Sequence, residues 1–220
     1  MRQPFGILFV CTGNMCRSPL AERLAGRWLT GSAAGVGVSS AGTHAVAGAA
    51  MHPDSAAALR RLGGDPGGFI ARQLTARLAE EADLILTAAR SHREMVGGLC
   101  PRAAARTFTL REFAGLAAAV PPGDITRLGS ATARARALTA AAHPLRARLA
   151  THQPHLLDVP DPVGRPMAVQ EATAQLIAGA LAGPMSLITG TPLAAHSGGS
   201  AAPAPAGPPP WPARDAGMRW

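Results

Sequence analysis

The chain has 220 residues and a formal net charge of +8, a length that suits one domain or one domain with a tail. It contains no lysine, so every basic residue other than histidine is arginine. These arginines are scattered and lack interleaved aromatic residues, so we interpret most of them as solvated helix faces and expect no nucleic-acid partner.

The cysteine count and the apolar segments favour a cytoplasmic protein. Three cysteines do not make a disulfide framework, and a reducing compartment fits them best. The N-terminus leads directly into a short predicted strand, without a long apolar signal region. Residues 168–189 lean apolar, but they include Gln170, Glu171, Gln175 and Pro184, so we expect them to be too polar and broken for a membrane span.

Strand-like and helix-like segments alternate along the chain. Buried-type apolar runs predict strands at residues 6–11, 36–41, 83–87 and 107–110. Apolar spacing and end signals predict helices at residues 18–30, 53–62, 75–81 and 90–97, from 111, and at 128–150 and 166–187. Pro144 is expected to kink or break the helix at 128–150. This order predicts a three-layer α/β/α domain with a four-stranded parallel sheet, whose ligands bind at the carboxyl ends of the strands.

The composition changes near residue 190. Proline, alanine, glycine and serine fill residues 190–213, which cannot bury enough apolar surface to fold. We therefore predict a domain at residues 1–189 and a disordered tail at 190–220. A docking segment within this tail is the alternative to a neutral extension.

The segment from Cys11 to Pro19 carries the chemistry that the sequence predicts. A strand leads into Cys11, and the spacing Cys-x5-Arg-Ser closes onto a predicted helix, with Gly13 suited to a tight turn. Backbone N–H groups of such a loop and the helix N-terminus favour a dianion. Ser18 is the expected N-cap, and Pro19 suits the first turn. Arg17 adds a planar fork for two phosphate oxygens, and a thiol in that field becomes a nucleophile.

This segment resembles the signature of the low-molecular-weight protein tyrosine phosphatases. The resemblance extends over about residues 5 to 185 and includes, in the family's order, residues 40–43, 71–75, 82–86 and 158–162. It implies a flavodoxin-like phosphatase fold of the bacterial type. It also implies hydrolysis of protein phosphotyrosine or a related aryl phosphate through a phosphocysteine intermediate, with no metal and no cofactor.

The resemblance also implies a role for each residue of the segment. Cys11 is the nucleophile, Arg17 holds the phosphate, and Ser18 donates a hydrogen bond to the sulfur. Asn14, which tolerates left-handed backbone angles, supports the loop together with Ser40. The residues expected to bind the substrate are Thr12, Gly13, Asn14, Met15, Cys16 and Arg17.

The general acid is expected in the late Asp-Pro motif. The resemblance assigns this role to Asp161, and Pro160 and Pro162 stiffen the loop around it. Asp158 is the competing candidate. In the resemblance Asp161 protonates the leaving phenolate and then takes a proton from the hydrolytic water.

Several further positions lie outside this catalytic assignment. Cys16 is either a redox partner that traps oxidised Cys11 as a disulfide, as in the family, or a small buried helix residue. Cys100 is expected to be structural. Phe69 stands where some relatives have a supporting histidine, and Val163 stands where many carry a pocket aromatic. His44 is a candidate for the pocket rim.

We therefore predict a cytoplasmic phosphatase that acts on a phosphotyrosine protein or a small aryl phosphate, with a bacterial tyrosine kinase as the implied partner. One alternative is an arsenate reductase on the same fold, which usually needs two further cysteines. A catalytically silent phosphate-binding or regulatory module is the other. Intact Cys11, Arg17 and Asp161 argue against the silent module.

Overall fold

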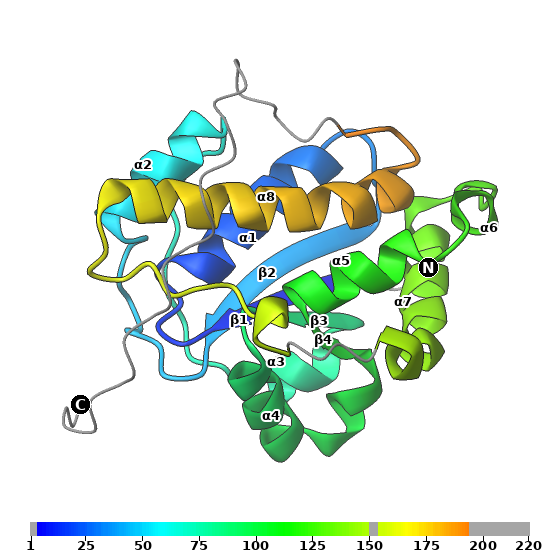
Figure 1. The fold of residues 1–220 in the computed structure, drawn as a ribbon, viewed down its shortest axis with the longest axis horizontal. Coiled ribbons are helices and arrows are strands. Elements are labelled where there is room, and N and C mark those ends of the chain that lie inside the picture. The colour runs from blue at the N-terminus through cyan, green and yellow to red at the C-terminus, as the bar shows by residue number, and fades with distance from the viewer. Residues whose placement is uncertain (1–3, 150–153, 194–220) are drawn as a thin grey trace.

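The computed structural model describes residues 4–149 and 154–193 (Figure 1). Within them, all strands pair in parallel in one sheet of order β2-β1-β3-β4. The strands are β1 (Phe5–Cys11), β2 (Val36–Gly42), β3 (Leu84–Thr87) and β4 (Thr107–Thr109). Cys11 pairs with Gly42 at the carboxyl end of β1, which is where the topology predicts a ligand site.

Helices cover both faces of this sheet, as Figure 1 shows. They are α1 (Arg17–Leu29), α2 (Pro53–Arg61), α3 (Ala76–Glu81), α4 (Arg90–Leu99), α5 (Leu110–Ala118), α6 (Pro122–Thr126), α7 (Ala131–Leu145) and α8 (Met167–Thr189). Short 3-10 helices lie at Pro101–Arg106, Arg146–Leu149 and Pro154–Leu157. The predicted three-layer α/β/α fold is confirmed.

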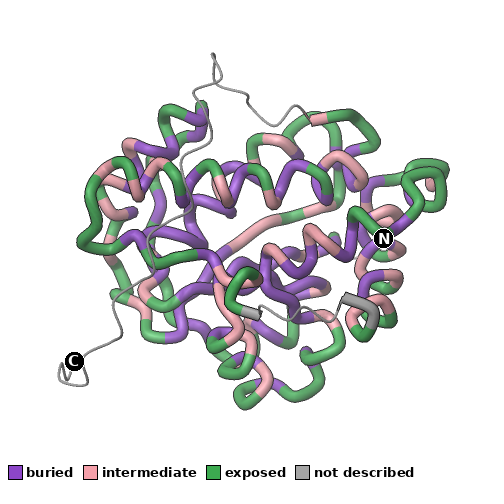
Figure 2. The backbone as a smooth tube through the Cα atoms, in the orientation of Figure 1, coloured by how far each residue is buried: buried purple, intermediate pink, exposed green. Residues whose placement is uncertain are grey.

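The side chains of β1 alternate between two apolar clusters. Phe5, Ile7 and Phe9 join the larger cluster with residues of α1, α2, α5, α7 and α8. Leu8 and Val10 join the smaller one, on the face covered by α3 and α4. The strand is therefore buried on both faces, as the purple centre of Figure 2 shows, and its last residue is held firmly in place.

The boundaries of two predicted elements were wrong. The expected helix at 128–150 begins at Ala131, because Ser130 accepts a hydrogen bond from the N–H of Ala133 as an N-cap, and it ends at Leu145, directly after Pro144. The short α6 was not predicted. β4 ends before Leu110, because Thr109 caps α5 in a capping box.

α8 is long and apolar enough to cross a membrane by length and composition alone. We expected residues 168–189 to be too polar and broken for a membrane span. The expected break was wrong, since the helix continues through Pro184. Its apolar character has another explanation. The helix packs against α1, α2, α5 and α7, and 61% of its most apolar stretch of 18 residues is buried inside the domain. It is the central helix of the larger cluster. The tail predicted at 190–220 lies, beyond residue 193, outside the described residues.

Candidate active site

Residues 12–16 form a loop between β1 and α1, and Cys11 lies at its base. Cys11 is the last residue of β1 and is buried. α1 begins at Arg17, so the unpaired N–H groups and the positive end of the helix face the loop. The thiol of Cys11 lies 2.9 Å from Ser18 Oγ.

The prediction that Ser18 caps α1 was wrong, because its hydroxyl is used inside the loop. The N-cap is Cys16, whose side chain makes no capping hydrogen bond. Ser18 Oγ accepts a hydrogen bond from Asn14 Nδ2 at 2.9 Å, which leaves the Ser18 proton for the sulfur of Cys11. A hydroxyl donor stabilises a thiolate, so this geometry suits the role expected of Ser18.

Asn14 is the centre of the hydrogen-bond network that shapes the loop. It is fully buried, and in the part of the chain that the structure describes no other non-glycine residue has a positive φ, here 54°. Its Nδ2 also donates to Ser40 Oγ at 2.8 Å, and its Oδ1 accepts from the N–H of Arg72 at 2.9 Å. The prediction of a left-handed, bridging Asn14 is confirmed.

The network extends to residues that the sequence did not single out. Ser40 Oγ donates to Glu22 Oε2 at 2.5 Å, so the buried hydroxyl of Ser40 is satisfied from α1. Arg72 Nε donates to the carbonyl of Ser40 at 2.7 Å. These contacts join segments that are distant in sequence and fix the loop against β2.

Glycine is required at Gly42 rather than at Gly13. A Cβ on Gly42 would lie 2.4 Å from the carbonyl oxygen of Thr12 and 2.9 Å from the nitrogen of Asn14, both backbone atoms. Gly13 has no positive φ, and a Cβ there would meet open space. The expected tight turn is made by Asn14. Gly13 lines the cleft.

Arg17 is held from several directions, and of its three guanidinium nitrogens only Nε lacks a hydrogen-bond partner. The residue is 7% exposed. Nη1 donates to the carbonyl of Val159 at 3.3 Å, while Nη2 lies 2.5 Å from Asp161 Oδ2 and 3.5 Å from Thr12 Oγ1. Nε is buried and has no hydrogen-bond partner. The Nε–Nη2 edge is the one that a phosphate would use for two parallel hydrogen bonds.

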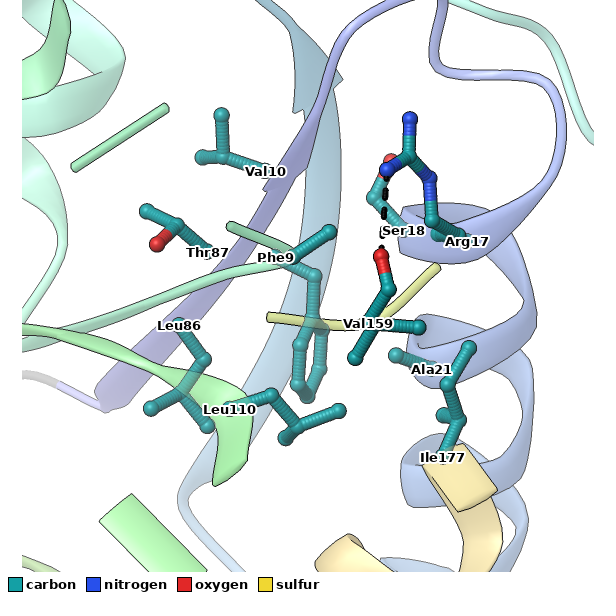
Figure 3. Close-up of a pocket in the computed structure, with 11 residues that line it drawn as sticks. Phe9, Val10, Arg17, Ser18, Ala21, Leu86, Thr87, Leu110, Val159 and Ile177 are labelled. Carbon is teal, nitrogen blue, oxygen red and sulfur yellow. Dashed lines mark hydrogen bonds between the residues drawn. The ribbon is translucent and has the colours of Figure 1, made fainter. Parts of the chain in front are cut away.

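Arg17 rests on the apolar interior of the domain. Figure 3 shows it with Ser18 at the start of α1, beside Val159 and above Phe9, Leu110 and Ile177. The void between these side chains measures about 10 Å³, near the smallest size that holds one water. Low polarity beneath a guanidinium strengthens its attraction for an anion on the other side.

The structure separates the two aspartates of the late motif. Asp161 pairs with Arg17 and is half exposed. Asp158 instead pairs with Arg90, at 3.2 Å between Oδ2 and Nη2, and accepts a further hydrogen bond from the N–H of Arg90 at 2.8 Å. Asp161 is therefore the carboxylate that lies with Cys11 and Arg17.

A cleft of about 460 Å³ opens over the sulfur. Its lining residues are Cys11, Thr12, Gly13, Met15, Cys16, Arg17, Val46, His52, Asp161 and Val163. Asn14, predicted to bind substrate, is absent from this lining because it supports the loop from behind. Val46 and His52 were missed by the sequence reasoning, since nothing in their local pattern marks them.

The rim of the cleft differs from the sequence expectation at one position. His44, the candidate rim residue, does not line the cleft and is exposed, with its N–H bonded to the carbonyl of Thr12. Val46 and Val163 line it instead and are 54% and 58% exposed. The rim is therefore aliphatic at these two positions, and the described lining contains no Phe, Trp or Tyr.

Cys16 is a buried thiol next to the site. Burial raises the pKa of Cys16 to about 11, although a hydrogen bond to Ser55 on α2 acts in the opposite direction. Cys16 is therefore protonated near neutral pH and is not itself a nucleophile there. Cys11 and Cys16 are both free, and the redox role of Cys16 stays a prediction.

His92, on α4, is a buried titratable group that the sequence reasoning missed. Its Nε2 lies 2.9 Å from Thr12 Oγ1, and its Nδ1 is buried without a partner. Burial, and after it the charge of Arg17, lowers the pKa of His92 to about 4. A neutral imidazole therefore contacts the first residue of the loop. No periodic pattern distinguishes this histidine from one at a helix surface.

Comparison with known proteins assigns the family. The sequence model of the low molecular weight phosphotyrosine protein phosphatases matches residues 6–121. The chain belongs to this family. It is 40% identical to the low molecular weight protein-tyrosine-phosphatase Etp of Escherichia coli K12 over 110 residues, which are 49% of this chain and 70% of Etp.

Two further relatives broaden the comparison. A protein-arginine-phosphatase of Bacillus subtilis is 34% identical over 109 residues, 49% of this chain and 71% of the relative. The crystal structure of a low molecular weight protein tyrosine phosphatase from T. tengcongensis aligns with a TM-score of 0.59 and 27% identity, covering 80% of this chain and 95% of that one. The match to the family model includes Cys11 and Arg17 but ends before Asp161, so the place of Asp161 rests on the geometry above.

Proposed function

We propose that this phosphatase hydrolyses phosphotyrosine or a related aryl phosphate with Cys11 as nucleophile and Asp161 as general acid and base. One observation carries the assignment of residues, namely that Cys11, Arg17 and Asp161 line one cleft although Asp161 is distant in sequence. Asp161 and Arg17 are already in contact across that cleft.

The first step forms a bond from Cys11 Sγ to phosphorus and breaks the bond from phosphorus to the aryl oxygen. The loop N–H groups, the N-terminus of α1 and the Nε–Nη2 edge of Arg17 stabilise the charge on the other phosphate oxygens. Protonated Asp161 gives its proton to the leaving phenolate. Phosphate and the carboxylate compete for Nη2 of Arg17, so substrate binding frees Asp161 for this transfer.

The second step releases inorganic phosphate. A water molecule attacks phosphorus, Asp161 takes one of its protons, and the bond from sulfur to phosphorus breaks. The hydrogen bond from Ser18 to Cys11 stabilises the departing thiolate. Cys11 and protonated Asp161 are regenerated, so no external reductant is consumed.

The lining of the cleft favours an aryl group over a guanidino group on the substrate. Met15, Val46 and Val163 present apolar surface to a ring. A phosphoarginine side chain needs a carboxylate partner for its guanidino nitrogens, and Asp161 is the only carboxylate among the lining residues of the described chain. In the proposed mechanism that carboxylate is the general acid, so it cannot also serve as a permanent partner for a guanidino group.

Arsenate reduction is disfavoured by the position of Cys100. That residue is buried in the smaller apolar cluster, on the face of the sheet covered by α3 and α4. It cannot accept a disulfide from the cleft and pass it to the surface without local unfolding.

The proposal includes a cytoplasmic location, which keeps Cys11 reduced, and a bacterial tyrosine kinase as the source of the substrate.

The test compares initial rates on matched peptides that carry phosphotyrosine, phosphoarginine or phosphoserine, beside thioredoxin-coupled arsenate reduction. We expect the highest kcat/KM for phosphotyrosine. A higher value for phosphoarginine would contradict the aryl assignment, and arsenate reduction without phosphatase turnover would contradict the reaction. Binding of phosphate without any turnover would identify the silent module.

A further inference from the structure

Gln170 is a buried polar residue near the start of α8. It is 1% exposed, and the buried residues further along the helix are apolar, for example Ile177, Leu181 and Met185, except for Thr173 and Thr189. An amide buried without hydrogen bonds destabilises the fold, so its partners indicate why it is tolerated.

Both ends of the Gln170 amide are satisfied, and one of them reaches the loop of the general acid. Nε2 donates to the carbonyl oxygen of Pro162 at 2.6 Å. Oε1 accepts from Ser55 Oγ, on α2, at 2.9 Å. Because α2 packs against α8, Ser55 fixes the orientation of the amide and thus the direction of its donor.

The segment that carries Asp161 is fixed on its upstream side by other contacts. The N–H of Val159 donates to the carbonyl of Ala88 at 2.7 Å, and the carbonyl of Val159 accepts from Arg17. Asp158 is held by Arg90. These bonds attach the chain before Asp161 to the end of β3, to α1 and to α4.

On the downstream side, the carbonyl of Pro162 is the attachment point. It accepts from the N–H of Arg165 at 3.0 Å, a bond within the same loop, and from Gln170 on the rigid α8. Asp161 thus lies between an upstream anchor at Val159 and a downstream anchor at Pro162. Together the two anchors restrict where the backbone points the carboxyl group.

We propose that Gln170 is a positioning residue for the general acid, acting through the carbonyl of Pro162. The inference rests on the proposed function, in which Asp161 protonates the leaving oxygen. Proton transfer depends steeply on placement, and a misplacement of about 1 Å can cost roughly a hundredfold in rate. The hydrogen bond from Gln170 to Pro162 does not contact Cys11, Arg17 or the loop 12–16. Gln170 reaches that loop only through Ser55, which contacts Cys16, and vanadate affinity reports on this second route.

The experiment compares phenyl phosphate, whose leaving group needs a proton, with para-nitrophenyl phosphate, whose leaving group needs it much less. Gln170→Met keeps the volume and removes the donor. Gln175→Met, the same change at an exposed position of α8, is the matched control, and Asp161→Asn is the reference for complete loss of the acid. Vanadate affinity reports on the phosphate site itself.

We expect Gln170→Met to slow phenyl phosphate roughly tenfold more than para-nitrophenyl phosphate, with unchanged vanadate affinity. Gln175→Met should alter neither rate. Equal slowing of both substrates would overturn the inference, since it would show a general structural effect. If Gln170→Met fails to fold, Gln170→Asn, which keeps an amide but shortens its reach, decides by the same comparison.

Asp161→Asn distinguishes a failure of the proposed role of Asp161 from a failure of the proposed role of Gln170. If Asp161→Asn itself shows no dependence on the leaving group, the proposed role of Asp161 fails, and the positioning role of Gln170 fails with it. If Asp161→Asn shows the dependence and the Gln170 variants do not, the inference about Gln170 alone is overturned.

Discussion

Arg17 and Asp161 are joined across the cleft by an ion pair of 2.5 Å between Nη2 and Oδ2. The guanidinium is 7% exposed and the carboxylate 50%, so the pair lies at the boundary between the interior and the solvent. The carboxylate occupies one of the two positions that a phosphate would take on Arg17. Binding of the substrate and release of the general acid are therefore coupled in this site.

Removal of the Asp161 charge should strengthen anion binding. Asp161→Asn leaves Arg17 without its anionic partner, so we expect inorganic phosphate to inhibit the variant several-fold more strongly than the wild type. The measurement is the inhibition constant for phosphate with para-nitrophenyl phosphate as substrate. Unchanged or weaker inhibition would show that the carboxylate does not compete with phosphate for Arg17.

Asp161→Asn should also slow hydrolysis in proportion to how basic the leaving group is. We expect phenyl phosphate to slow by roughly two to four orders of magnitude and activated aryl phosphates by much less. Asp158→Asn is the comparison, because Asp158 pairs with Arg90 away from the cleft. A leaving-group effect in Asp158→Asn and none in Asp161→Asn would reverse the assignment of the acid.

Gly42 should tolerate no side chain. In Gly42→Ala the Cβ would lie 2.4 Å from the carbonyl oxygen of Thr12, so the loop must move away from β2. We expect turnover to fall at least a hundredfold, because the loop N–H groups lose their alignment. Gly37→Ala is the matched control on the same strand, where a Cβ meets open space. Similar activities of the two variants would contradict the close packing of the loop.

His92 should make the folded protein sensitive to acid. Its pKa is lowered to about 4 in the folded state, so between about pH 6.5 and pH 4 the unfolded chain binds a proton that the folded chain does not. Stability is therefore lost as the pH falls through this range, by up to about 3 kcal/mol in full.

Urea unfolding of the wild type and His92→Gln between pH 7 and pH 4 measures this contribution. His92→Gln should lose less stability on acidification than the wild type, whichever of the two proteins is more stable at pH 7. His155→Gln, at an exposed position, is the control and should follow the wild type. Parallel curves for wild type and His92→Gln would contradict a neutral, buried imidazole.

Local patterns were sufficient to predict the fold and the base of the site. The strand before Cys11, the helix after it and the left-handed Asn14 all follow from neighbouring residues. What the sequence did not reveal depends on contacts between distant segments. Ser18 is a good N-cap by composition, yet its hydroxyl is needed by Cys11 and Asn14. Only the folded structure shows that Asp158 pairs with Arg90, which leaves Asp161 as the candidate for the general acid.

The missed residues share one physical feature. Glu22, His92 and Gln170 are polar groups on helices, where a sequence pattern predicts solvent exposure. Glu22 instead contacts Ser40 on β2, and the other two contact loops of the site. Their roles come from the partners they find after folding. A polar side chain that finds one or two distant partners has no periodic signature in the sequence.

The central claim is that Cys11 forms a covalent bond to phosphorus. Rapid acid quenching during turnover of an activated aryl phosphate, labelled at phosphorus, followed by peptide mapping, tests it directly. We predict label on the peptide that contains Cys11 in the wild type, and no label and no turnover in Cys11→Ser. Label on another residue, or hydrolysis that survives in Cys11→Ser, would contradict the account.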